Sequence, residues 1–107
     1  MGERMRKPSK RDLLLAAEVV EHAWALWQLY GCDRDPGLRA VREAVEQRTR
    51  EFNQQSWGRL FRRGSDGEWH RSRGIAAMAA DGERYRLERR GRREMMLALH
   101  RHLWGNG

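Results

Sequence analysis

Apolar residues recur every three or four positions between Lys10 and Tyr30, and this spacing constrains the fold more than any other feature of the chain. Residues at that spacing line one side of an α-helix, so the segment is predicted to be a helix with a buried face. The stripe consists of Leu13, Ala16, Ala17, Val20, Ala23, Trp24, Trp27 and Tyr30. Ser9 and Asp12 form a helix start signal and Gly31 a stop signal, so we expect one helix from about Lys10 to Tyr30.

A second line of apolar residues lies beside this stripe and widens the apolar arc of the helix. It consists of Leu15, Val19, Leu26 and Leu29. The arc is wider than one neighbouring helix would cover, and small domains bury a limited share of their surface. The helix is therefore either central to the fold or partly docked on another protein chain, and we expect association through it. The candidate interface residues are Leu15, Val19, Trp24, Leu26 and Trp27.

A second helix is predicted after a turn at Cys32–Gly37. Asp35 followed by Pro36 is typical of a helix N-cap and first helical position. The single apolar stripe that follows contains Leu38, Val41, Val45, Thr49 and Phe52. Because the turn is short, the two helices are expected to form an antiparallel hairpin over residues 10–54.

The next segment is compatible with two structures. Ser56–Gly64 reads as a short helix, but RLFRR and EWHRS joined by the GSDG turn also read as a β-hairpin. We favour the helix. Gly74 then interrupts the segment Trp69–Ala80, and Asp81-Gly82 is expected to end it.

The last predicted helix runs from about Glu83 to Trp104. Its packed side contains Leu87, Gly91, Met95, Ala98, Leu99 and Leu103, and its opposite side contains Arg86, Arg89, Arg90 and Arg93. The predicted fold is therefore all-α, a small bundle of four to five helices with no sheet of more than two short strands. We expect a single domain over residues 1–107, made of a basic arm (1–9), the helical hairpin (10–54) and a basic helical half (55–107).

Positive charge is concentrated in the second half. Of the 22 Lys and Arg residues, 20 are Arg, and the net charge is +1 over residues 1–54 and +6 over residues 55–107. Guanidinium groups bind phosphates through paired hydrogen bonds and stack on bases. The candidate nucleic-acid-binding residues are Arg59, Arg62, Arg63, Arg71, Arg73, Arg84, Arg86, Arg89, Arg90 and Arg93.

Aromatic residues alternate with these arginines at Trp57, Phe61, Trp69 and Tyr85. Exposed rings beside cations are common in proteins that hold single strands, because every base offers a face for stacking. In a domain this small, each ring taken alone is more typical of a core residue. We therefore expect phosphate contacts from the arginines and core packing from the rings.

The residues needed for catalysis or metal binding are not arranged together. His100 and His102 are two positions apart and point to different sides of a helix, and His22 follows Glu18 by four residues, as in a surface ion pair. The chain contains neither a Walker-type phosphate loop nor a dinucleotide fingerprint. We expect no enzyme activity, no cofactor and no metal.

The single cysteine, Cys32, excludes an internal disulfide and fits a reducing cytoplasm. The longest segment without a charged residue, His22–Cys32, is well short of the roughly 20 apolar residues of a membrane span. Acidic residues interrupt what would be the apolar part of a signal peptide. We expect neither export nor membrane insertion.

Tyr85-Arg86-Leu87 followed by Gly91-Arg92 resembles the point in winged-helix transcription regulators where the last wing strand passes into a helix. The resemblance implies that Trp69–Ala80 is the recognition helix, with Arg71, Ser72 and Arg73 near base edges. The short connection Ala80–Arg84 departs from that family, because it leaves no room for a first wing strand.

The whole chain, short, helical and arginine-rich with a basic second half, resembles the small helical subunit of CRISPR RNA-guided effector complexes, which act in antiviral defence. This resemblance implies several copies along larger backbone subunits, contacting guide RNA or the target strand without catalysis. The expected function is thus a non-catalytic small subunit of a ribonucleoprotein assembly. Its expected partners are RNA or single-stranded DNA, larger protein subunits and copies of itself. The alternatives are a winged-helix DNA-binding regulator and a protein adaptor or inhibitor that binds no nucleic acid.

Overall fold

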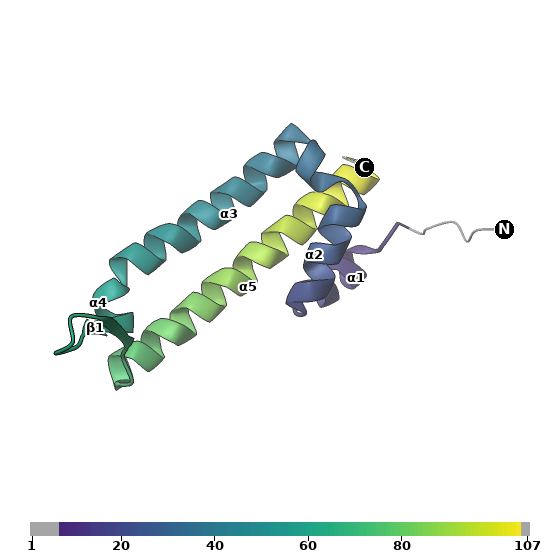
Figure 1. Cartoon of the computed structure of the whole chain (residues 1–107). Coiled ribbons are helices and arrows are strands. Elements are labelled where there is room, and N and C mark those ends of the chain that lie inside the picture. The colour runs from purple at the N-terminus through teal and green to yellow at the C-terminus, as the bar shows by residue number, and fades with distance from the viewer. Residues whose placement is uncertain (1–6, 106–107) are drawn as a thin grey trace. The chain divides into compact units, whose positions relative to one another are not determined.

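The computed structural model describes residues 7–105 and is mainly helical over that range (Figure 1). The elements in chain order are α1 (Lys10–Ala17), α2 (Val20–Leu29), the 3-10 turn η1 (Cys32–Arg34), α3 (Pro36–Gln55), α4 (Trp57–Leu60), β1 (Phe61–Arg63), β2 (Trp69–Arg71) and α5 (Ile75–Trp104). Five α-helices and one two-stranded sheet in the described range confirm the predicted all-α class. Most of the predicted basic arm, residues 1–6, lies outside that range.

The chain divides into two compact units, and their limits differ from the expected division after residue 54. The first unit combines the chain up to Glu43 with the chain from Arg89 onward. The second unit is Ala44–Glu88. Helices α3 and α5 each contribute one part to both units, so the boundary between the units crosses helices instead of a loop.

The prediction of one helix from Lys10 to Tyr30 is wrong, because the helix is interrupted between the end of α1 and the start of α2. Val19 is extended, with φ −115° and ψ 107°. The break is held by the C-terminal part of α5: Arg92 Nε donates to the carbonyl of Ala17 at 2.9 Å, and Arg89 Nε lies 2.7 Å from a Glu18 carboxylate oxygen. The bond from Arg92 gives the Ala17 carbonyl a partner that the interrupted helix does not supply, and no glycine or proline marks the position.

The predicted start of the first helix is confirmed. The Ser9 hydroxyl accepts from the amide of Asp12, and the Asp12 carboxylate accepts from the amide of Ser9, both at 3.1 Å. This reciprocal pair satisfies amide groups that the first helical turn leaves without partners. Hydrogen bonding from the Ser9 side chain and from the Ser9 amide lowers the pKa of the Asp12 carboxyl.

The chain reverses between α2 and α3 around Asp33. The Asp33 carboxylate accepts from Trp27 Nε1 at 3.2 Å and from Arg42 Nη1 at 2.6 Å, and the bond from Arg42 lowers the pKa of Asp33. The guanidinium of Arg42 also lies over the Trp24 ring, 4.4 Å from its centroid. Asp35 caps α3 as predicted, since its carboxylate accepts from the amide of Leu38 at 2.9 Å.

The core of the first unit joins α1, α2 and η1 to the C-terminal half of α5. Its most buried members are Leu13, Ala17, Trp27, Cys32, Met96 and Leu99, each with at most 1% of its surface exposed. Met95 and Ala98, at 5%, belong with Leu99 to the packed side predicted for the last helix, whereas Leu87 and Leu103 of that side are half-buried. At the end of α5, Trp104 Nε1 donates to the carbonyl of Pro8 at 3.0 Å.

In the second unit, the helix favoured for Ser56–Gly64 ends early, and the hairpin alternative is correct. Helix α4 stops at Leu60, which is buried together with Ser56, and β1 pairs antiparallel with β2 from the next residue onward. The amide of Gly67 donates to the carbonyl of Gly64 at 3.0 Å, and Gly67 has φ +80°. A turn of this kind followed by a left-handed glycine is a common hairpin connection.

Helix α5 begins at Ile75 and continues through Asp81-Gly82, so the predicted boundary at Glu83 is wrong. The Asp81 carboxylate pairs with Arg71 of β2 and with Arg84 one turn later, which holds this position within the helix. A glycine inside a helix costs only about 1 kcal/mol relative to alanine, so Gly82 can be accommodated within α5.

The elements implied by the winged-helix resemblance are not present at the expected positions. Tyr85-Arg86-Leu87 is helical instead of the last wing strand. Trp69–Arg71 is a strand, and Ser72 and Arg73 lie in the connection before α5, so Trp69–Ala80 is not one recognition helix.

Candidate nucleic-acid interface

The ten arginines predicted to bind nucleic acid are spread over several elements. Arg59 belongs to α4, Arg62, Arg63 and Arg71 to the hairpin, Arg73 to the connection, and Arg84, Arg86, Arg89, Arg90 and Arg93 to α5. Those up to Arg86 lie in the second unit, and the last three lie in the first unit. The second unit therefore holds most of the predicted site.

Five of these arginines are in ion pairs with acidic residues of their own unit. The pairs are Arg59–Glu83 at 3.3 Å, Arg71–Asp81, Arg84–Asp81 at 3.6 Å, Arg89–Glu18 at 2.7 Å and Arg93–Glu18 at 3.9 Å. The hydrogen bond from Arg89 lowers the pKa of Glu18 below its ordinary value of 4.5. The expected phosphate-binding face of α5 is therefore only partly available, because two of its four arginines hold the break between α1 and α2.

The side chains of four other arginines are exposed and make no ion pair or hydrogen bond with any residue of the range 7–105. They are Arg62, Arg73, Arg86 and Arg90. An exposed guanidinium without an internal partner keeps its charge and all five of its donors for a ligand. Three of the four, Arg62, Arg73 and Arg86, belong to the second unit.

One face of the hairpin combines aromatic rings and guanidinium groups. Phe61 lies opposite Arg71 and Arg63 lies opposite Trp69 in the strand register, and directly opposed residues share a face of the sheet. The Arg71 guanidinium is 5.3 Å from the centroid of Phe61, and that of Arg63 is 5.9 Å from the centroid of Trp69. Both distances lie within the range of cation–π attraction.

Trp57 of α4 extends this face. Its ring centroid is 4.3 Å from that of Phe61, with 30° between the planes, and 5.7 Å from that of Trp69 in an edge arrangement of 75°. We call the set Trp57, Phe61, Arg63, Trp69 and Arg71 the aromatic–arginine face. All five residues lie in the second unit.

The expectation that the interleaved rings are core residues is wrong for three of the four. Trp57 is 42% exposed, Trp69 50% and Tyr85 55%, whereas Phe61 is half-buried beneath Trp57. The sequence interpretation undervalued these rings because an aromatic residue in a small domain is usually needed for its core. The alternation of Trp and Phe with Arg was the signal that pointed to exposure.

The opposite face of the hairpin is polar. Arg62 lies opposite His70, and His70 Nε2 is 3.0 Å from the Asp66 carboxylate, a contact that lowers the pKa of Asp66. An open hollow of about 430 Å³ lies at the turn, and a Cβ on Gly64 would approach Asp66 Oδ1 and His70 Cδ2 to 2.6 Å. The hollow is lined by Arg62, Arg63, Gly64, Ser65, Asp66 and His70. The Asp66 carboxylate makes this hollow less suited to binding an anion than the aromatic–arginine face is.

The candidate protein-interface residues separate into exposed and buried members. Leu15 is 59% exposed and Val19 is 47% exposed, whereas Trp24 and Leu26 are half-buried. Trp27 has no exposed surface, so its inclusion was wrong: it packs in the core with its Nε1 bound to Asp33. Leu29, at 56%, is an exposed apolar residue that the candidate set omitted.

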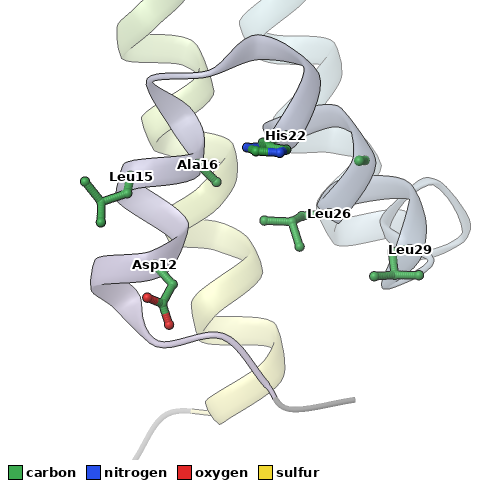
Figure 2. Close-up of a pocket in the computed structure, with 7 residues that line it drawn as sticks. Asp12, Leu15, Ala16, His22, Leu26 and Leu29 are labelled. Atoms are coloured by element: carbon green, nitrogen blue, oxygen red, sulfur yellow. The ribbon is translucent and has the colours of Figure 1, made fainter. Parts of the chain in front are cut away.

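The exposed apolar residues of α1 and α2 border an open groove of about 460 Å³. Figure 2 shows Ala16 of α1 and Leu26 and His22 of α2 directed toward one another across it. Asp12, Leu15, Ala25 and Leu29 complete the lining. The groove is mainly apolar, with a carboxylate at one edge.

Two further exposed apolar residues lie on the first turns of α5, where the sequence interpretation had not placed this helix. Ile75 is 87% exposed and Met78 is 70% exposed. Together with Gly82 and Tyr85, they are spaced three or four positions apart, as on one side of a helix. The sequence-based prediction missed this pattern because the segment was expected to end at Asp81-Gly82.

No group of three or more His, Cys, Asp or Glu residues within residues 7–105 is arranged to hold a metal ion. Burial, with the charges of Asp33 and Asp35, raises the pKa of the Cys32 thiol to about 11, so it is protonated at neutral pH. None of the described helices is both long enough and apolar enough to cross a bilayer. Comparison of the chain with protein-family models, curated proteins and solved structures found no match.

Proposed function

We propose that this protein binds nucleic acid without catalysing a reaction on it, and that the second unit makes the main contact. The observation that carries the proposal is the aromatic–arginine face, where Trp57 and Trp69 are 42% and 50% exposed and guanidinium groups lie beside Trp69 and Phe61. Rings of this size are normally buried, so their exposure next to cations favours a ligand with flat rings and negative charge.

The unpaired arginines supply the electrostatic part of the interaction. Arg62, Arg73 and Arg86 are exposed in the second unit, whose residues 44–88 carry nine arginines and seven acidic residues, a net charge of +2. Neutralising a phosphate releases counterions, so the affinity should fall steeply with salt. Contacts of this kind bind the backbone and discriminate little between sequences.

The resemblance to small helical subunits of CRISPR effector complexes supplies a setting for this activity. In that setting the protein is one subunit of a cytoplasmic ribonucleoprotein assembly, with RNA or single-stranded DNA as its ligand and larger subunits as its neighbours. The winged-helix alternative has less support, because the helix and strand that it requires are not at the expected positions.

The proposal is tested with Arg62→Ala, Arg73→Ala and Arg86→Ala combined in one variant. A matched control, Arg11→Ala with Arg34→Ala and Arg101→Ala, removes the same charge from exposed arginines of the first unit. Fluorescence anisotropy with labelled RNA, single-stranded DNA and duplex DNA over a salt series measures the affinity. The first variant should bind at least tenfold more weakly and lower the slope of log affinity against log salt by about 0.7 to 0.9 for each phosphate that it no longer neutralises.

Equal weakening in both variants would mean that only net charge matters, and the assigned site would be wrong. If the wild-type protein binds none of the three ligands at low salt, the proposed function fails and a protein adaptor remains.

A second candidate function is self-association, favoured by the exposed apolar groove of the first unit. Its counterpart is the stripe formed by Ile75, Met78 and Tyr85, which is exposed on α5 in the second unit. Asp12 lies at the groove, whereas the unpaired Arg73 and Arg86 are neighbours of the stripe in sequence. Apolar surfaces with opposite charges at their edges suit one another, so the occupant we propose for the groove is the stripe of a second copy.

A further inference from the structure

We infer that the aromatic–arginine face stacks unpaired bases, so that the preferred ligand is a single strand and not a duplex. This inference rests on the proposed nucleic-acid binding and specifies its ligand class. The evidence for it is the arrangement of the aromatic rings within α4 and the hairpin. If arginines bound only the phosphate backbone, no such arrangement of rings would be needed.

The rings form a supported platform. Phe61 is half-buried and carries the Trp57 ring at 4.3 Å, while the edge contact between Trp57 and Trp69 fixes the second tryptophan at 5.7 Å. Each tryptophan makes contacts within the platform and still leaves about half of its surface open, at 42% and 50% exposed. When a base stacks on such a ring, the protein loses little conformational entropy, because contacts within the platform already restrict the ring.

The cations of the face are held in place as well. Arg63 Nε donates to the carbonyl of Gly67 at 3.2 Å while its guanidinium lies beside Trp69. Arg71 is held beside Phe61 by its ion pair with Asp81. One guanidinium therefore lies beside Trp69 and another beside Phe61, on which Trp57 packs, so the phosphates of a bound strand would meet positive charge on the same face.

A duplex cannot use this platform without being disrupted. Its bases already stack on one another, and exposing a base face requires unstacking and unpairing. A single strand offers its base faces freely. The same surface would therefore bind a single strand through rings and phosphates, and a duplex through phosphates only.

The composition of the face favours nucleic acid over a protein partner. Its five members are three aromatic and two cationic residues, without an exposed aliphatic side chain. The surrounding segment, residues 57–73, contains five arginines and only two acidic residues. A hydrophobic protein contact would be surrounded by unbalanced positive charge.

The decisive ligand is an abasic strand, which keeps the phosphates and lacks the bases. Anisotropy is measured with labelled oligothymidine, an abasic strand of equal length and a duplex of that length. Trp57→Leu and Trp69→Leu are compared with Trp104→Leu, which changes an exposed tryptophan of the first unit. Trp69→Phe keeps a stacking ring, and circular dichroism of every variant confirms that the fold is retained.

The wild-type protein should bind oligothymidine more tightly than the abasic strand. Trp57→Leu and Trp69→Leu should each weaken oligothymidine binding by about 5- to 150-fold and leave abasic and duplex binding unchanged. Trp69→Phe should restore part of the affinity, and Trp104→Leu should have no effect.

Equal binding of oligothymidine and the abasic strand would overturn the stacking inference while leaving backbone binding intact. Equal weakening on all three ligands in the Leu variants would overturn it too, because the rings would then serve only to support the hairpin. If no strand binds at all, the proposed function itself fails.

Discussion

At the scale of single residues, the hairpin turn depends on Gly67. Its φ of +80° lies in the left-handed region, which residues with a Cβ rarely adopt. The carbonyl of Gly67 also accepts from Arg63 Nε at 3.2 Å, so the same residue that closes the turn positions a cation of the aromatic–arginine face. A change at this position should therefore affect both folding and binding.

Gly67→Ala should destabilise the protein by about 1 to 2 kcal/mol, because alanine in the left-handed region is strained. Urea unfolding followed by tryptophan fluorescence measures the change. Gly58→Ala is the matched control: a Cβ at Gly58 meets nothing within 4 Å and lies in α4, so it should leave stability unchanged or raise it. Equal effects of the two substitutions would contradict the role assigned to the turn.

At the scale of elements, the break between α1 and α2 is held by α5. Glu18 lies at the C-terminal end of α1, where an acidic residue is unfavourable with respect to the helix dipole. Its ion pairs with Arg89 and Arg93 compensate for this position, and Arg92 binds the adjacent carbonyl. Glu18 thus joins the end of α1 to α5.

Glu18→Gln should lower stability at pH 7 and make stability less sensitive to acid. The folded-state pKa of Glu18 lies below its ordinary value of 4.5, chiefly because of the hydrogen bond from Arg89. Its contribution is therefore fully present above pH 4.5 and disappears as the pH falls through the lower folded-state value. Thermal unfolding monitored by circular dichroism between pH 7 and pH 3 measures this difference.

The matched control for this prediction is Glu21→Gln. Glu21 is exposed, follows the same break and makes no ion pair with a residue of the range 7–105. Its replacement should leave the acid dependence unchanged. An equally flattened profile in both variants would show that general charge, and not the Glu18 contact, sets the acid sensitivity.

At the scale of the whole molecule, apolar surface remains exposed in both units. The groove of the first unit and the stripe of the second unit together account for most of the large apolar side chains that are at least half exposed between residues 7 and 105. Water contact with such side chains is unfavourable, at roughly 25 cal/mol for each Å² of apolar surface. A second copy that covers both surfaces would remove this penalty.

Leu15→Gln with Leu29→Gln should abolish self-association, and so should Ile75→Gln with Met78→Gln, as measured by sedimentation velocity. A mixture of the two double variants should associate again, because one intact groove then meets one intact stripe. Each variant alone should remain monomeric. If only the leucine variant fails to associate, the groove binds another groove and the proposed occupant is wrong.

Signals between near neighbours in the chain predicted much of this structure. Ser9 and Asp12 cap α1, Asp35 and Pro36 start α3, and the periodic apolar positions gave the helical class, since hydrogen bonds and side-chain contacts within one turn decide these features. The excess of arginine over acidic residues in residues 55–107 likewise predicted the net positive charge of that half directly from the sequence.

Contacts between distant segments decided the rest. Arg92 and Ala17 are 75 positions apart, and their hydrogen bond holds a helix break that no local residue indicates. The ion pair between Arg71 and Asp81 similarly accompanies a helix that continues through an expected stop. The exposure of Trp57 and Trp69 depends on which residues fill the core around Leu60, which spacing along the chain does not specify. Local free-energy preferences of about 1 kcal/mol were therefore overridden wherever tertiary packing and pairing contributed more.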